Sequence, residues 1–228
     1  MKHALASISA FLAVAQFAGA QVLATWTFES NTPADLSNST TISGVAADFG
    51  AGTASGFHAS AATDWTTPVG NGSANALSSN TWSVGDYYQF TVATLGYSGI
   101  SVSWDQTGSN TGPASFALSY SINGTDFTNA YSYSVTNGSW SASSAVTTTS
   151  FAFDFSGVEA LNNQTAVQFR LTDLGTVAIN GGTVAAGGTG RVDNFSVSAA
   201  AIPETSTYAM IFGGLTLGFV VLRRRMRR

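Results

Sequence analysis

The 228-residue chain contains no cysteine, so disulfide bonds and thiolate chemistry contribute to neither its fold nor its function. Lysine occurs only at position 2, and charged residues make up 9% of the sequence. Between Gln21 and Ile202, two basic residues, Arg170 and Arg191, stand against eleven acidic ones, which gives a formal charge of −9. Because phosphate binding draws on clustered Lys and Arg, we expect no nucleic-acid partner.

Groups that could carry out acid–base or nucleophilic chemistry are also scarce. Beyond the first 20 residues, His58 is the only histidine, and its neighbours give no sign of a Ser–His–Asp site. We therefore expect His58 to be a satisfied histidine in a loop or at a strand edge. The carboxylates are scattered singly, without the closely spaced pair that glycoside hydrolysis uses. We therefore expect that the protein is not an enzyme. A glycan-active enzyme is the less favoured alternative, because its catalytic residues would have to come together from distant parts of the sequence.

What the chain does have is alternation of apolar and polar residues in short segments, as at 100–105 and 116–121. A period of two indicates strands with one buried face. The pair Asn123-Gly124 accepts positive φ angles and is typical of a tight hairpin. Several half-buried strands separated by turns predict an all-β fold, a two-sheet antiparallel jelly-roll-like sandwich over residues 21–198.

The N-terminus has the pattern of a secretory signal peptide over residues 1–20. Lys2 precedes an apolar run from Ala4 to Ala18, and the small residues Ala18-Gly19-Ala20 end just before Gln21. The alternative is an N-terminal anchor helix, but the run is shorter than the ~20 residues that span a bilayer. We expect the mature chain to begin at Gln21 and to be exported.

The C-terminus carries a second apolar segment. Residues 208–222 contain no charge, and as a helix they extend ~22 Å against ~30 Å of hydrocarbon. Flanking residues can extend this span, so we predict one transmembrane helix from about 206 to 224 with the basic end in the cytoplasm. The basic end, residues 223–228, contains five arginines: Arg223, Arg224, Arg225, Arg227 and Arg228.

The order of these features over residues 199–228 resembles the bacterial PEP-CTERM sorting signal, also labelled the ice-binding protein C-terminal domain. The motif is Pro203-Glu204-Thr205, with threonine where the family has a second proline. The resemblance implies recognition by an exosortase-type membrane protease in a Gram-negative bacterium, commonly one that makes extracellular polysaccharide. It implies a place in the cell envelope or extracellular matrix. An ordinary C-terminal membrane anchor is the alternative, and it also places the domain at the surface.

The segments "VLATWTFE" and "RVDNFSVS" resemble the terminal strands of jelly-roll domains of the galactose-binding or carbohydrate-binding-module kind. This resemblance implies a fold, and together with the sorting tail it favours exopolysaccharide binding. A structural or adhesive surface protein without a small ligand is the alternative. Trp65, Trp82 and Trp140 lie in Ser/Thr/Asn-rich stretches, so we predict that they are exposed and stack on sugar rings; the alternative is that they anchor the core or loops.

The same resemblance implies structural calcium where the first and last strands meet, and Glu29 and Asp193 are the matching residues. Asp193 has the strand parity of Phe195, so it points toward the core, where a lone carboxylate is costly. Calcium would compensate that charge. The alternative is an ion pair with Arg170 or Arg191, together with backbone amides.

Overall fold

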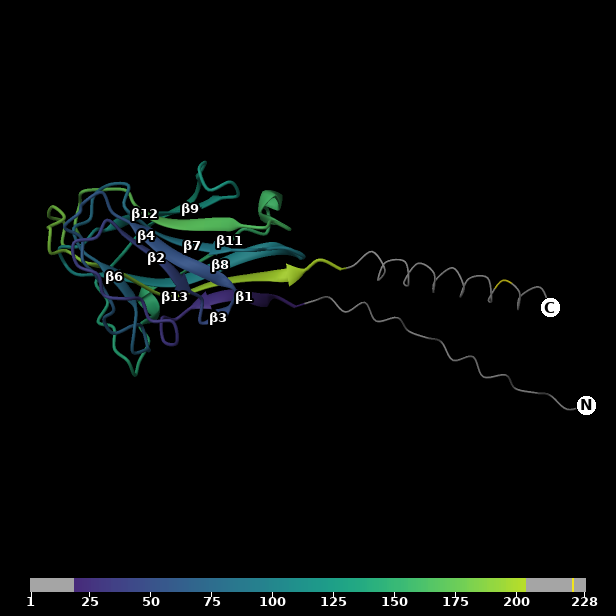
Figure 1. Cartoon of the computed structure of the whole chain (residues 1–228), viewed down its shortest axis with the longest axis horizontal. Coiled ribbons are helices and arrows are strands. Elements are labelled where there is room, and N and C mark those ends of the chain that lie inside the picture. The colour runs from purple at the N-terminus through teal and green to yellow at the C-terminus, as the bar shows by residue number, and fades with distance from the viewer. Residues whose placement is uncertain (1–18, 204–222, 224–228) are drawn as a thin grey trace, which may run out of the picture. The chain divides into compact units, whose positions relative to one another are not determined.

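The computed structural model describes residues 19–203 and Arg223. Residues 20–201 form one compact unit in which the regular secondary structure is almost entirely strand (Figure 1). The predicted signal peptide, apart from its last two residues, lies outside the described residues. So do Glu204 and Thr205 of the sorting motif, the predicted helix up to residue 222, and the arginines after Arg223. Within the described part of the chain, no helix is long and apolar enough to cross a membrane.

The strands form two antiparallel sheets, which confirms the predicted two-sheet sandwich. Sheet A contains β11 (Ser150–Asp154), β8 (Tyr97–Gly108), β13 (Gly190–Ala201), β1 (Gln21–Trp26) and β3 (Phe49–Gly50) in that order, with β6 (Leu77–Ser79) beside β13 and β5 (Trp65–Thr66) beside β6. Sheet B contains β10 (Thr128–Ser134), β9 (Ser115–Ser121), β12 (Val167–Asp173), β7 (Tyr87–Val92), β4 (Gly52–Phe57) and β2 (Thr41–Ala46). Two 3-10 turns, η1 (Thr147–Thr149) and η2 (Glu159–Leu161), complete the described elements.

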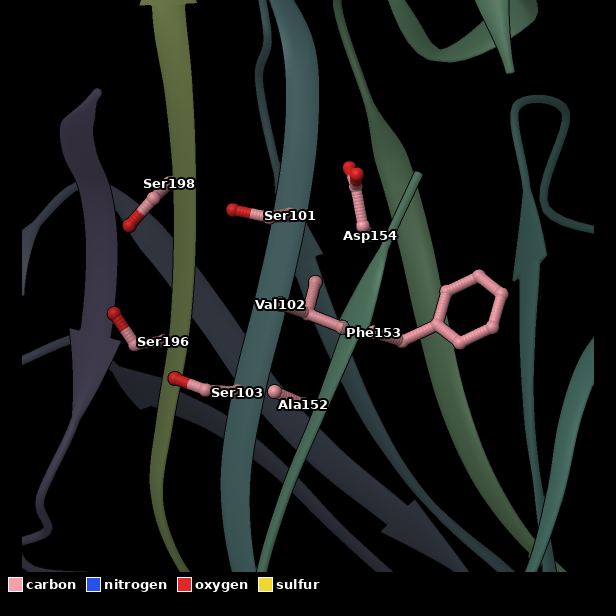
Figure 2. Close-up of a pocket in the computed structure, with 8 residues that line it drawn as sticks. All are labelled: Ser101, Val102, Ser103, Ala152, Phe153, Asp154, Ser196 and Ser198. Carbon is pink, nitrogen blue, oxygen red and sulfur yellow. The ribbon is translucent and has the colours of Figure 1, made fainter. Parts of the chain in front are cut away.

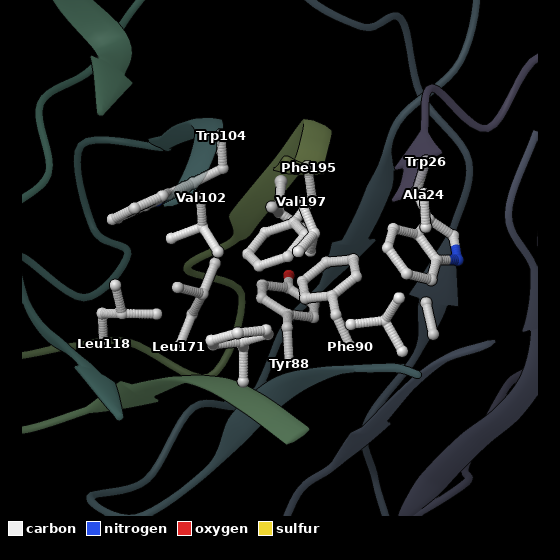
Figure 3. Packing of buried hydrophobic residues seen from close by; sticks show 14 of the residues in the cluster. Ala24, Trp26, Tyr88, Phe90, Val102, Trp104, Leu118, Leu171, Phe195 and Val197 are labelled. Atoms are coloured by element: carbon white, nitrogen blue, oxygen red, sulfur yellow. The ribbon is translucent and has the colours of Figure 1, made fainter. Parts of the chain in front are cut away.

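The core lies between the two sheets and is rich in aromatic rings (Figure 3). Phe90 of β7 and Phe195 of β13 stack face to face across the sandwich, with ring centroids 3.7 Å apart and an interplanar angle of 2°. Trp26 of β1 meets Phe90 edge-on at 5.2 Å. All three side chains are fully buried. Alternation along β1, β7 and β13 therefore places one aromatic residue of each strand in a single apolar layer.

Asp48, in the turn between β2 and β3, organises the loop that follows β1. Its carboxylate accepts backbone N–H bonds from Thr27 and Phe28 at 2.8 Å, Ser30 at 2.6 Å and Asn31 at 2.9 Å. Partial burial pushes the pKa of Asp48 upward, but the four N–H donors outweigh it and hold the pKa below its usual value. The charged carboxylate thus stabilises a loop in which Phe28, at φ 58°, is buried in the core.

The β9–β10 hairpin confirms the turn predicted at Asn123-Gly124, but the connection is longer than a tight two-residue turn. Gly124 has φ +80°, and the side-chain oxygen of Asn123 accepts the N–H groups of Thr125 and Asp126. The outward-facing β9 residues Ala117, Ser119 and Ser121 are 3%, 8% and 2% exposed. The hairpin therefore covers part of the outer face of sheet B, and it carries Phe127 onto that face.

Candidate functional site

The three tryptophans predicted to be exposed are buried, so that prediction is wrong. Trp65, Trp82 and Trp140 are 0%, 6% and 7% exposed. Each indole N–H donates to an oxygen of the protein at 2.9–3.0 Å, which satisfies the polar edge of the ring inside the fold. Trp65 and Trp82 both pack edge-on against Tyr88 in the aromatic core. These tryptophans therefore present no free face on which a sugar could stack.

The structure brings Ser79, His58 and Asp86 into a row that no local sequence pattern predicts. The Nε2 atom of His58 lies 3.1 Å from Ser79 Oγ, and Nδ1 lies 3.3 Å from Asp86 Oδ2, although the latter contact is not aligned as a hydrogen bond. The three residues are at most 1% exposed. Ser79 Oγ also bonds to the Tyr88 hydroxyl at 2.9 Å. The three side chains follow each other in the order Ser–His–Asp, as in a catalytic triad.

A substrate cannot reach this row as it stands. The His58 ring meets Trp65 and Trp82 edge-on, with centroids 4.9 and 4.3 Å away. Burial lowers the pKa of His58 to about 4, so the ring is neutral at physiological pH. Burial also raises the pKa of Asp86. These contacts make the row a buried polar network that joins β6 and β7 to the loop after β4.

Asp193 points inward, as its strand parity predicts, and is fully buried. Its carboxylate accepts the N–H of Asn71 at 2.8 Å, the hydroxyl of Ser73 at 2.7 Å and the N–H of Asn194 at 2.7 Å. Burial nevertheless raises its pKa to about 7, because these donors only partly offset the loss of hydration. Glu29 accepts the N–H of Asn75 at 2.6 Å. The two predicted metal ligands therefore hold the same loop.

The alternative to calcium was that an arginine and backbone amides satisfy the Asp193 carboxylate. The contacts above supply the backbone amides. Among the described residues, neither Arg170 nor Arg191 forms an ion pair with Asp193. Arg191 donates instead to the carbonyl oxygen of Val69 at 2.9 Å. The described part of the chain holds no group of three or more His, Asp and Glu side chains arranged for a metal ion. Calcium bound by Glu29 and Asp193 stays a prediction, because backbone carbonyls could supply the remaining oxygen ligands.

A shallow pocket of about 360 Å³ lies on the outer face of sheet A (Figure 2). Four serines from β8 and β13 line it, together with Asp154 of β11. The ring of Phe153 points away from the serine hydroxyls. The pocket therefore offers hydroxyl groups and one carboxylate without an aromatic surface. The serines are Ser101, Ser103, Ser196 and Ser198.

The outer face of sheet B carries a different set of side chains. Strand register aligns a polar row across five strands, made of Asn129, Ser119, Arg170, Gln89 and Ser55. In the next row, Thr172 of β12 lies opposite Tyr87 of β7, which lies opposite Phe57 of β4. Tyr87 thus faces outward, one position before the buried Tyr88. Aromatic and amide side chains therefore share this face.

Arg170 is held between two aromatic rings at the centre of this face. Its guanidinium carbon lies 3.8 Å from the centroid of the Tyr87 ring and 3.7 Å from that of Phe127. Its Nε donates to Gln89 Oε1 at 2.8 Å. The Phe57 ring stacks beside Tyr87, with centroids 5.8 Å apart. Phe57, Tyr87, Arg170 and Phe127 therefore form a continuous strip of flat groups.

A groove of about 270 Å³ runs beside this strip, and we call it the sheet B groove. It is lined among others by Tyr87, Ser119, Phe127, Asn129, Arg170 and Thr172. Such a mixture of apolar rings with a few convergent polar groups is typical of small-molecule sites. Part of this groove could have been identified from the sequence, because alternation along the strands places Tyr87 and Arg170 at outward positions.

Comparisons with known proteins assign no family: no family model and no curated protein matches the chain. The resemblance of the tail to the PEP-CTERM signal therefore stays a prediction. The chain is similar to the CBM22-1–CBM22-2 tandem of Paenibacillus barcinonensis Xyn10C, with 13% identity and a TM-score of 0.47 over 85% of this chain and 50% of that one. It thus spans half the length of that protein.

Two further solved structures are similar over most of their own length. The K3 cleaved adhesin domain of Lys-gingipain from Porphyromonas gingivalis has 14% identity and a TM-score of 0.39, over 78% of this chain and 98% of that one. TmCBM61 in complex with β-1,4-galactotriose has 14% identity and a TM-score of 0.33, over 75% and 90%. At these values the similarities carry no conclusion about ligand or activity.

Proposed function

We propose that this chain is an exported protein of the cell envelope or extracellular matrix that binds exopolysaccharide through the sheet B groove. The observation that carries the proposal is the strip of Phe57, Tyr87, Arg170 and Phe127 on an outward sheet face. Sugar rings have apolar C–H patches that pack on aromatic surfaces, while amide and hydroxyl groups bind their hydroxyls. Asn129 and Thr172 supply such groups beside the rings.

The size of the groove suits a short stretch of a polymer. Its volume, about 270 Å³, falls just below the range of about 300–1,000 Å³ that is usual for drug-sized ligands. The groove therefore accommodates only a short part of a polysaccharide chain. The neighbouring sugar units would extend over the outer face of sheet B. The serine-lined pocket of sheet A is a weaker candidate, because it presents no aromatic surface.

Alanine substitution of the aromatic rings tests the proposal. Tyr87→Ala and Phe127→Ala should each weaken binding to the host's own exopolysaccharide about fivefold, since a well-placed aromatic contact contributes on the order of 1 kcal/mol. Affinity electrophoresis of the purified protein in gels containing the polysaccharide measures this. Phe49→Ala is the matched control, because Phe49 is 61% exposed on β3 of sheet A.

The outcome separates the two functions considered above. Saturable binding that both groove variants weaken, and that the Phe49 variant does not, supports polysaccharide binding. Absence of binding to this polymer and to a glycan array would favour the alternative, a structural or adhesive surface protein without a small ligand.

We propose further that the tail, with Pro203-Glu204-Thr205 as its motif, is recognised by an exosortase-type protease. The five terminal arginines oppose translocation of the tail, so their removal should release or mis-sort the protein. Different epitope tags at the mature N-terminus and at the C-terminus, followed by cell fractionation, measure both location and cleavage. Cytoplasmic accumulation of a chain that keeps both tags would refute export and sorting together.

A further inference from the structure

Arg170 is a cation without an acidic partner in the described part of the chain. Its one hydrogen bond to the protein there runs from Nε to the neutral Gln89. Among the described residues, the one contact within 4 Å between a basic and an acidic side chain joins the neutral His58 to Asp86. The groove that Arg170 lines contains no Asp or Glu. Although the domain has eleven acidic residues and two basic ones, this cation has no counter-charge within 4 Å among the described residues.

The surroundings of Arg170 also fix the direction from which a partner must approach. The Tyr87 and Phe127 rings lie 3.8 and 3.7 Å from the guanidinium carbon, so they block approach from their own sides. Gln89 occupies its Nε side. The free donors are therefore the two Nη groups, which lie in the plane of the guanidinium. An acceptor that enters this plane can take two parallel N–H bonds, which is the geometry of an arginine–carboxylate pair.

Partial burial adds an energetic reason for an anionic ligand. It lowers the pKa of Arg170, although arginine keeps its proton at neutral pH. A partly dehydrated charge without a partner is unfavourable, so an anion that binds here recovers part of that cost. The net negative charge of the domain opposes anion binding, but salt screens the contribution of exposed charges beyond about 8 Å.

We propose that the sheet B groove selects acidic polysaccharide, with Arg170 binding the carboxylate of a uronic-acid residue while the neighbouring rings contact the sugar. This inference rests on the proposed function and names its ligand class. A carboxylate is planar, so it can lie in the plane of the guanidinium between the two flanking rings. A sulfate ester can also accept two N–H bonds in that plane, but its other two oxygens project out of the plane toward the flanking rings.

Two polymers that differ in the carboxyl group alone provide the test. Oligogalacturonides and the same oligomers after reduction of their carboxyl groups are titrated into the purified full chain by calorimetry. We expect the acidic oligomer to bind about tenfold more tightly, because hydrogen bonds between charged groups are stronger than neutral ones. Raising the salt concentration should weaken binding of the acidic oligomer and leave the neutral oligomer unchanged.

Variants assign the preference to one side chain. Arg170→Met keeps a long side chain between the rings and should bind both oligomers equally, at the affinity of the wild type for the neutral one. Arg170→Lys keeps the positive charge but lacks the planar guanidinium with its paired Nη donors. It should retain part of the preference for the acidic oligomer. Arg191→Met is the matched control, because Arg191 bonds to Val69 outside the groove and its loss should leave the preference intact.

The possible results separate the two proposals. Equal binding of the acidic and neutral oligomers by the wild-type protein would overturn the acidic selectivity but leave glycan binding standing. A sulfated galactan that binds as tightly as the oligogalacturonide would overturn the assignment to a carboxylate. Failure to bind any of these oligomers or the host polysaccharide would overturn both. The salt dependence is measured on the wild-type protein. It therefore tests the preference for the acidic oligomer even when a variant does not fold.

Discussion

Phe195→Ala is expected to lower the free energy of unfolding by about 3–5 kcal/mol, the usual cost of removing a buried phenylalanine. Phe195 is fully buried on β13, a central strand of sheet A. Its ring stacks on Phe90 of the opposite sheet at 3.7 Å and meets Trp26 edge-on at 6.0 Å. The substitution therefore leaves a cavity at the contact between the two sheets, and the rigid rings around it cannot easily close it.

Thermal unfolding followed by circular dichroism measures this effect. A loss of that size should lower the melting temperature by roughly 10 °C, because 1 kcal/mol corresponds to ~2–4 °C in a domain of this length. Phe49→Ala again serves as the control and should stay within about 0.5 kcal/mol of the wild type, since its ring is exposed. A melting temperature of the Phe195 variant within 2 °C of the wild type would contradict the core described here.

Acidification should destabilise the fold through His58. Burial lowers the pKa of His58 in the folded protein to about 4, from about 6.5 in the unfolded chain. Between these values the unfolded state binds the extra proton, so the contribution of His58 to stability falls as the pH falls from 6.5 to 4. The full shift corresponds to a loss of about 3 kcal/mol.

Three buried carboxyl groups act in the opposite direction. Burial raises the pKa of Asp86, that of Asp173 to about 6 and that of Asp193 to about 7. The folded state therefore binds protons at these groups more strongly than the unfolded one, and their contribution to stability falls as the pH rises from about 4 to 7. The pH profile of the wild type alone is thus a sum of opposing effects.

Comparison with His58→Gln isolates the histidine, because glutamine does not titrate. We expect the wild type to be the more stable protein at pH 7, and its advantage over the variant to shrink as the pH is lowered to 4. Urea unfolding at several pH values measures the difference. An advantage that stays constant from pH 7 to pH 4 would show that His58 is not held neutral by burial.

Alternation along single strands allowed the sandwich, and the inward direction of Asp193, to be predicted from the sequence. Each of these depends on a period of two within a few residues, which the sequence displays directly. The partners of Asp193 were less accessible to such reasoning. Asn71 and Ser73 lie in a loop more than a hundred residues away. No local pattern shows that this loop folds over the carboxylate.

The candidate site was mispredicted for a related reason. Polar neighbours suggested that Trp65, Trp82 and Trp140 are exposed, but the three rings are buried and their N–H groups find acceptors inside the fold. In contrast, Tyr87 and Arg170 stand at outward positions that alternation alone could have identified. The contact of Arg170 with Phe127 depends on how the β9–β10 hairpin folds over sheet B, which the sequence does not display.

The most direct test of polysaccharide binding at sheet B is an NMR titration of the protein with exopolysaccharide oligomers. We predict that the largest shifts occur in the ring resonances of Tyr87 and Phe127 and in the side-chain Nε–H resonance of Arg170. The resonances of Ser101 and Ser198 on sheet A should stay unchanged. Shifts confined to the serine-lined pocket, or no shifts at saturating oligomer, would contradict the assignment of the binding site to the sheet B groove.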